Sequence, residues 1–387
     1  MGAYKFCTCM ERIINSLNQG IKKATIIALV SVFFLAACKT LKNEAEPVQL
    51  SNEALQLSVN PNGGAITNIT LASMEINFLN WSLRPEQMPE NNQEGAPFQG
   101  HFLCYGRWGA PTEGEINAGV PHNGHHNNLE WSWESENNHL KMEVYSPLDQ
   151  ARIHRSIILH ENFPLFYVKE SFEHVSSTGR LSNIVQHVTL GPPFLTDSLR
   201  IFSNCTLGFL QELSWPEPQL YEYSWPLGED NEANQFDLSI FQGNRNFVST
   251  HIIEDSIGWV IAVDPVSNSF LGYIWEMEDY PWINFWNYNQ DGVPHAYGME
   301  FGTTGIGRSY QDLLSTNTGF HGRQSYYFMD AGEKIQKEYC GFAGRIPEHY
   351  PQFENIRIDS FITIIFKKPI IKDYFTIEYD LYSIIDN

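Results

Sequence analysis

The stretch from Ile153 to Phe172 reads IHRSIILHENFPLFYVKESF. It holds two apolar runs, Ile153–Leu159 and Leu165–Phe172, with Asn162 and Pro164 between them. Short runs of alternating or wholly apolar residues that are broken by Asn and Pro are typical of β-strands. This part of the sequence therefore predicts two strands.

The same pattern continues along the chain from Leu50 onward. Alternation with a period of two dominates, and long stretches with the spacing of an amphipathic helix are absent. One helical turn is expected, at Arg308–Leu314. Because no change of composition marks an internal boundary, we expect one large all-β domain, a sandwich or a barrel. The other runs of this kind include Leu55–Val59, Ile66–Leu71, Ile184–Leu190, Ile252–Val263, Phe270–Trp275 and Phe361–Phe366.

Composition limits the class of protein and its partners. Of the 387 residues, 42% are hydrophobic and 18% are charged, which is enough apolar material for a large core. Asp and Glu total 45 against 24 Lys and Arg, so the net charge is −21. Such a chain repels phosphate backbones, and we expect no nucleic acid partner.

The N-terminal segment has the features of an export signal. Lys22 and Lys23 precede an apolar run, Ala24–Ala37, that is too short to span a hydrocarbon core of about 30 Å. The run ends in Leu35-Ala36-Ala37-Cys38, which resembles the lipobox of bacterial lipoproteins, where the Cys is acylated and becomes the mature N-terminus. We therefore expect a signal peptide over residues 1–37, lipid on Cys38, a polar tether over 38–49, and a protein anchored by lipid in the bacterial cell envelope, as a periplasmic or outer-membrane lipoprotein.

The remaining cysteines predict a fold without a disulfide framework. Cys7 and Cys9 would leave with the signal peptide, and Cys38 would carry lipid, so Cys104, Cys205 and Cys340 remain. Three cysteines form at most one disulfide, even in an oxidising compartment. The core itself must hold the fold.

The chain is rich in aromatic residues, with 25 Phe, 18 Tyr and 10 Trp. Several of the Trp residues stand among Asn, Gln and acidic residues. Such surroundings suit sugar binding, because a pyranose ring offers an apolar C–H face surrounded by hydroxyl groups. A monosaccharide or oligosaccharide is therefore the expected ligand.

Three polar clusters interrupt the strand pattern. Together with the early Gly63-Gly64-Ala65-Ile66, their order and separations resemble the aldose 1-epimerase (galactose mutarotase-like) superfamily, in its divergent bacterial branch. The resemblance extends over about residues 50–366 and implies a very large antiparallel β-sandwich, called a supersandwich. Residues 367–387 lie beyond it as a C-terminal extension, and the sequence does not indicate their role. The clusters are Tyr105–Trp108 with Gly119–Trp131, then Gln186–Phe194, and then Pro281–Trp286 leading to Gly298–Thr304.

The resemblance also implies roles for individual residues. Glu300 matches the catalytic base and His187 the catalytic acid. Arg107, with either His122 or His125, would contact sugar hydroxyls. The sequence departs from the family pattern at two places: Asn123 stands between His122 and Gly124, which leaves the choice of histidine open, and Phe301 replaces a proline after the glutamate. Trp282 or Trp286 would supply the surface on which the sugar stacks.

The implied reaction explains the need for these residue types. Interconversion of α and β anomers removes the proton of the C1 hydroxyl while the ring oxygen is protonated, so that the ring opens, turns about C1–C2 and closes again. One base and one acid suffice, and no cofactor is required. With ordinary pKa values of about 4.3 and 6.5, the carboxylate would accept the proton and the imidazole would donate one.

Other functions remain open at this point. The protein could bind carbohydrate without turning it over, or be related to polysaccharide lyases and hydrolases, which contain similar sandwiches. His122, His125 and His126 offer three imidazoles within five residues. Their loop contains no Cys, and such spacing is more typical of a polar loop, so we expect no metal site.

Overall fold

A computed structural model describes residues 46–212, 216–315 and 319–381. The expected signal peptide, the lipid-bearing Cys38 and most of the tether lie outside these residues. Within them, no helix combines the length and apolar character needed to cross a membrane. The described residues from Glu46 onward belong to one compact unit.

The first sheet has ten strands, and β10 and β20 are neighbours near its middle. All of its strand pairs are antiparallel. Its order is β1 (Val48–Ser51), β2 (Leu55–Val59), β3 (Ile66–Leu71), β4 (His101–Gly106), β10 (Asn183–Leu190), β20 (Val293–Gly302), β19 (Trp282–Gln290), β16 (Phe247–Ile253), β12 (Cys205–Leu210) and β13 (Tyr223–Ser224).

The second sheet has eight antiparallel strands. The stretch from Ile153 to Phe172 forms two of them, which pair with Ile157 opposite Val168, so the prediction of two strands is confirmed. The order is β11 (Arg200–Ser203), β17 (Ile257–Asp264), β18 (Ser269–Glu276), β22 (Lys334–Arg345), β8 (Leu165–His174), β7 (Ala151–Leu159), β6 (His139–Ser146) and β5 (Ser132–Glu136).

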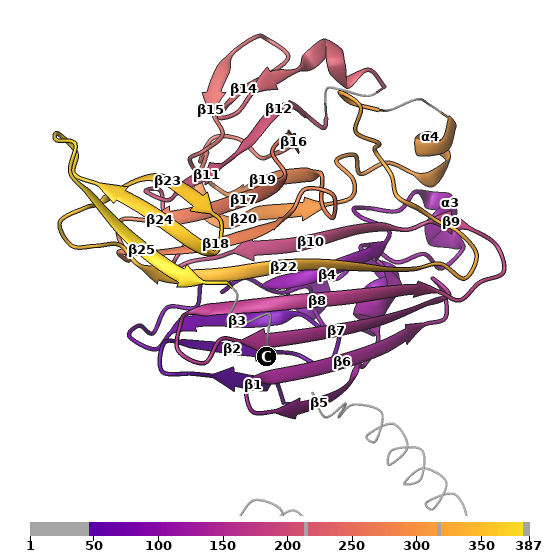
Figure 1. Cartoon of the computed structure of the whole chain (residues 1–387). Helices are drawn as coiled ribbons and strands as arrows, with labels where there is room; N and C mark the ends of the chain where they lie inside the picture. The colour runs from indigo at the N-terminus through magenta and orange to yellow at the C-terminus, as the bar shows by residue number, and fades with distance from the viewer. Residues whose placement is uncertain (1–45, 213–215, 316–318, 382–387) are drawn as a thin grey trace, which may run out of the picture. The chain divides into compact units, whose positions relative to one another are not determined.

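The two large sheets lie one behind the other (Figure 1). Both contribute side chains to one main hydrophobic core. On β8, Phe166, Val168 and Phe172 point into this core, whereas Leu165 and Tyr167 belong to a second core on the other face of the sheet. This alternation is the period of two expected for a strand. The prediction of an all-β sandwich is confirmed.

A third, three-stranded sheet covers the outer face of the eight-stranded one. Its strands are β23 (Gln352–Ile358), β24 (Phe361–Lys367) and β25 (Tyr374–Asp380). Ile362, Ile364 and Phe366 pack in the second core, and the Tyr379 hydroxyl donates to the Ala343 carbonyl at 2.8 Å. Residues after 366 thus include the strand β25, which pairs with β24 along its whole length.

Smaller elements complete the described residues. The expected helical turn is present, because α4 spans Tyr310–Ser315. Cys104, Cys205 and Cys340 are all buried free thiols, which agrees with a fold held by its core. The other elements are α3 (Glu113–Asn117), the strand pairs β9 (Arg180–Leu181) with β21 (Phe328–Met329) and β14 (Leu227–Glu229) with β15 (Gln235–Asp237), and the 3₁₀ turns η1 (Pro85–Gln87), η2 (Glu90–Asn92), η3 (His125–Asn128) and η4 (Pro218–Tyr221).

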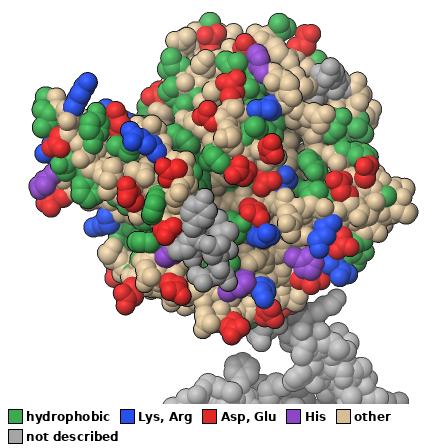
Figure 2. Space-filling model, in the orientation of Figure 1, with side chains coloured by type: hydrophobic (Ala, Val, Ile, Leu, Met, Phe, Trp, Pro, Cys, Tyr) green, Lys and Arg blue, Asp and Glu red, His purple; other side chains and the backbone are tan. Residues whose placement is uncertain are grey.

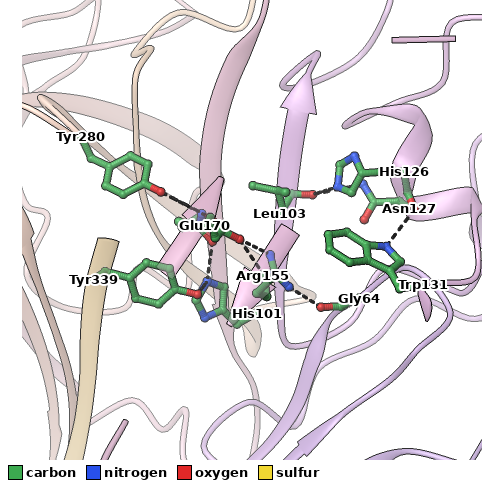
Figure 3. A network of polar contacts seen from close by, with 11 residues as sticks. Gly64, His101, Leu103, His126, Asn127, Trp131, Arg155, Glu170, Tyr280 and Tyr339 are labelled. Atoms are coloured by element: carbon green, nitrogen blue, oxygen red, sulfur yellow. Dashed lines mark hydrogen bonds and ion pairs between the residues drawn. The ribbon is translucent and has the colours of Figure 1, made fainter. Parts of the chain in front are cut away.

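A buried ionic network lies between the two large sheets (Figure 3). Arg155 of β7 and Glu170 of β8 form an ion pair at 2.6 Å, and their side chains are 2% and 0% exposed. Gln186 of β10 donates to the second carboxylate oxygen at 2.5 Å, and the Arg155 guanidinium donates to the Gly64 carbonyl. The network therefore connects strands of both sheets.

Gly64 occupies a position that excludes a side chain. Its φ is +73°, and a Cβ placed there would lie 2.8 Å from the ring of buried Trp131. We expect Gly64→Ala to lower the free energy of unfolding by about 1–3 kcal/mol, because it adds both backbone strain and a clash. Urea unfolding measures this change. Gly114→Ala is the matched control, since nothing lies within 4 Å of its Cβ position, and equal midpoints for both variants would contradict the prediction.

Candidate active site

The site lies on the face of the ten-stranded sheet that is turned away from the eight-stranded sheet. His187 on β10 is the direct partner of Glu300 on β20. Their chain neighbours Val188, Met299 and Phe301 point into the main core. Since side chains alternate along a strand, His187 and Glu300 point to the opposite face. Two residues far apart in the sequence are thereby placed side by side.

The two side chains are in contact. His187 Nε2 lies 3.2 Å from Glu300 Oε1. The indole N–H of Trp108 donates to the other carboxyl oxygen, Oε2, at 2.8 Å. His187 Nδ1 lies 2.9 Å from the Thr189 hydroxyl, and Phe102 stacks on the imidazole at 4.3 Å between ring centroids. Both groups are thus held in fixed orientations.

A cavity of about 430 Å³ opens over this pair. This volume is in the range of small-molecule sites in proteins. Four of the residues predicted from the sequence line it: His122, His187, Trp286 and Glu300. The aromatic part of the wall comprises Trp81, Phe98, Phe102, Trp108, Trp286 and Tyr288, and the polar part includes Gln87, Asn123, Gln211, Gln290 and His295.

Burial makes the neutral forms of the pair more stable. His187 is 8% exposed and Glu300 is 2% exposed. Burial raises the pKa of Glu300 to about 8, although the hydrogen bond from Trp108 opposes the rise. Burial, together with a smaller effect of the neighbouring His122, lowers the pKa of His187 to about 3. The pair therefore carries no net charge at neutral pH, with the proton on the carboxyl.

His122 is the histidine of the loop that reaches the cavity. Burial lowers its pKa to about 4, and the positive charge of Arg107 acts in the same direction. Its imidazole is therefore neutral at pH 7 and can both donate and accept a hydrogen bond. The alternative that the sequence left open, His125, does not line the cavity.

Two further residues expected at the sugar, Arg107 and Trp282, do not line the cavity. The Arg107 guanidinium donates to the carbonyls of Arg308 and Ala110, and it also lies 3.8 Å from Glu115. Trp282 is fully buried, and its N–H donates to the Gln324 carbonyl at 2.9 Å.

The histidines of the loop also separate spatially. His125 Nδ1 lies 3.1 Å from the Ser146 hydroxyl, and His126 Nε2 lies 2.9 Å from the Leu103 carbonyl. His122 faces the cavity. Among the described residues, no three His, Cys, Asp or Glu side chains are grouped as metal ligands.

Trp108 contacts the pair of His187 and Glu300, although the sequence assigned it no role in the site. It belongs to the Tyr105–Trp108 cluster, in which Arg107 was the residue predicted to contact the sugar. The strand β4 ends at Gly106. Phe102, Cys104 and Trp108 share one hydrophobic cluster on the cavity side, whereas Leu103 and Tyr105 point into the main core. Continued alternation therefore brings Trp108, rather than Arg107, to Glu300.

We expect Trp108→Phe to raise the pKa of Glu300. The indole N–H favours the ionised carboxylate, so its removal should move the Glu300 titration upward by about one pH unit. The midpoint can be followed by infrared difference spectroscopy of the carboxyl band against Glu300→Gln. Trp81→Phe is the control, since Trp81 lines the cavity and no hydrogen bond joins it to Glu300. An unchanged midpoint in Trp108→Phe would contradict this role.

Comparison with known proteins gives structural matches only. No protein-family model matches the chain, and no curated protein matches its sequence. A galactose mutarotase related enzyme from Lactobacillus acidophilus superposes with a TM-score of 0.56 at 11% identity, over 78% of this chain and 98% of that one. A galactose mutarotase-like protein from Clostridium acetobutylicum gives 0.54 at 13% identity, over 77% and 95%.

A third match is an Escherichia coli protein provisionally described as an aldose 1-epimerase. Its TM-score is 0.54 at 12% identity, over 77% of this chain and 99% of that one. Identities this low establish the fold and nothing finer. The described part of the chain therefore has a galactose mutarotase-like fold.

Proposed function

We propose that the cavity binds a sugar and that His187 and Glu300 interconvert its anomers. The observation that carries this proposal is the 3.2 Å contact between the imidazole and the carboxyl on one cavity wall. The C1 hydroxyl and the ring oxygen are both bonded to C1, so an acid and a base that serve them must lie within a few ångströms of each other. The residues were predicted from the sequence, and the mutarotase-like fold supports the assignment.

The reaction needs one proton acceptor and one proton donor. One member of the pair takes the proton of the C1 hydroxyl while the other protonates the ring oxygen, and the C1–O5 bond breaks. After rotation about C1–C2, the two proton transfers run in reverse and the ring closes on the other face. The resemblance assigns the base to Glu300. The buried pair can also start with the proton on Glu300, in which case His187 is the acceptor.

The aromatic wall supports a sugar as the ligand. Trp286 lies 5.8 Å from His187 and 5.7 Å from both Trp81 and Tyr288, measured between ring centroids. Flat rings beside a hydrogen-bonding pair fit the apolar face and the hydroxyls of a pyranose. Trp286 is therefore our candidate for the stacking surface.

We expect activity to be level between about pH 3 and pH 8. Above the pKa of Glu300, which is about 8, the carboxyl proton is lost and the pair has a base without an acid. Below the pKa of His187, which is about 3, the imidazole is protonated and the pair has an acid without a base. Initial rates of anomer equilibration, corrected for the uncatalysed rate at each pH, measure this profile. A rate that rises through pH 8 would contradict it.

The direct test of function uses freshly dissolved α-glucose and α-galactose. Polarimetry should show faster approach to the equilibrium mixture when the protein is added. Acceleration supports the epimerase. If calorimetry shows that the sugars bind and polarimetry shows no faster equilibration, the protein is a carbohydrate-binding module. The orientation of Arg107 favours this second candidate, because its guanidinium binds backbone carbonyls and one expected ligand of the sugar hydroxyls is missing.

We also propose that the domain is attached to a bacterial envelope membrane through lipid on Cys38. The support is the sequence alone, an apolar run that ends in Leu35-Ala36-Ala37-Cys38. Mass spectrometry of the protein from a bacterial host should find an acylated Cys38 at the N-terminus. Cys38→Ser should abolish both the cleavage and the lipid.

A further inference from the structure

The turn between β24 and β25 exposes apolar side chains. Residues 367–375 read KKPIIKDYF, and we call them the tip. Ile370 is 94% exposed and Ile371 is 58% exposed. Figure 1 shows the tip, in yellow at the upper left, at the free end of the three-stranded sheet. A projecting pair of isoleucines is costly in water, because burial of each would remove its apolar surface from solvent.

The residues around the isoleucines are of two kinds. Tyr374 and Phe375, which follow directly, are 47% and 44% exposed. Three lysines flank the pair: Lys367 pairs with Glu354, Lys368 lies 2.5 Å from Asp373, and Lys372 has no ion-pair partner among the described residues. In Figure 2, green and blue side chains lie at the upper left, where the tip lies in Figure 1, and red ones lie among them. The tip is thus apolar at its end and aromatic and basic behind it.

This order matches the layers of a phospholipid surface. Apolar side chains enter the acyl boundary, aromatic rings occupy the headgroup level, and lysines extend toward anionic headgroups. Residues 367–375 contain three lysines and one aspartate, an excess of positive charge in a chain with a net charge of −21.

A second, independent feature of the sequence points to the same partner. The apolar run Ala24–Ala37 and Cys38 predict a lipid-anchored protein. A weakly inserting element in a chain that also carries a lipid anchor adds a second attachment and restricts the orientation of the domain on the bilayer.

We propose that the tip inserts Ile370 and Ile371 into the interface of an anionic phospholipid bilayer, with Lys368 and Lys372 at the headgroups. The contact is additional to the proposed lipid on Cys38 and independent of the proposed reaction.

A tryptophan added to the full chain tests the insertion locally. Ile371→Trp and the control Leu314→Trp are mixed with vesicles of phosphatidylglycerol whose acyl chains are brominated, since bromine quenches indole emission on contact. Leu314, on α4, is 61% exposed, close to the 58% of Ile371. The emission of each added Trp is obtained by subtraction of the wild-type signal. We expect the Trp at 371 to lose about half of its emission or more, and the Trp at 314 to lose none.

Three results would overturn the proposal. The first is that the Trp at 371 stays unquenched. The second is that both added Trp residues are quenched alike, through general adsorption. The third is that the emission at 371 shifts with protein concentration in the absence of vesicles, which would mean that a second copy covers the tip. The lysines are tested by Lys368→Gln with Lys372→Gln in the Ile371→Trp chain. This change should reduce quenching by phosphatidylglycerol and not by brominated phosphatidylcholine, and equal quenching before and after would overturn the headgroup contact.

Discussion

Glu300→Gln should remove the acceleration of anomer equilibration and leave sugar binding largely in place. General acid–base catalysis of this kind contributes about 10²–10⁴-fold, and we expect a loss of that order. The amide has the shape of the carboxyl and can still accept the hydrogen bond from Trp108, but it can neither give nor take the proton. Because the carboxyl is protonated in the buried pair, the substitution replaces one neutral group by another, and the fold should be retained.

The loss must be separated from damage to the fold and to binding. Initial rates by polarimetry, sugar affinity by calorimetry and thermal unfolding are measured on the same sample. Glu115→Gln is the matched control: the chemical change is identical, and the carboxylate lies beside Arg107, outside the cavity. Full activity in Glu300→Gln would contradict the proposal that His187 and Glu300 act as an acid–base pair. An equal loss in Glu115→Gln would instead place Arg107 in the reaction.

The strands could be predicted from the sequence because their side-chain alternation is local. The pairing of His187 with Glu300 could not be predicted from local alternation, because the register between β10 and β20 depends on hydrogen bonds between strands that are far apart in the sequence. The two residues were assigned to one site through the family resemblance. Trp108 lies beyond the end of β4, on the side of Phe102 and Cys104, as alternation places it. Its hydrogen bond to Glu300 joins residues far apart in the chain, so the sequence could not show that the indole would reach the carboxyl.

The two tryptophans of β19 illustrate a different limit. Trp282 and Trp286 have the same parity in the strand and so share one face of the sheet. Phe209 and Phe320 pack against Trp282, with ring centroids at 6.4 and 6.1 Å, whereas Trp286 stays at the cavity wall. The residues that cover Trp282 come from segments distant in the chain, so alternation alone could not show which of the two tryptophans lines the cavity.

Glu170→Gln should cause the largest loss of stability among single substitutions in the network between the sheets (Figure 3). The Arg155 guanidinium is 2% exposed and has Glu170 as its counter-ion at 2.6 Å. Removal of that charge leaves a buried cation uncompensated, which costs about 3–5 kcal/mol. Arg155 would keep its bond to the Gly64 carbonyl and its place over the Trp131 ring, which are weak substitutes for a carboxylate.

Denaturant unfolding is measured on the wild type, Glu170→Gln, Arg155→Met and the double variant. Their free energies of unfolding separate the net contribution of the ion pair from the cost of leaving one charge unpaired. We expect Glu170→Gln and Arg155→Met each to lower the free energy of unfolding strongly, and the double variant to lose much less than the sum, because neither charge is then left alone. Glu134→Gln, which removes an exposed partner of Lys141 at 3.5 Å, should shift the midpoint little. Additive losses in the double variant would mean that each side chain acts through its own packing. The ion pair would then contribute nothing to joining the sheet that carries His187 and Glu300 to the sheet behind it.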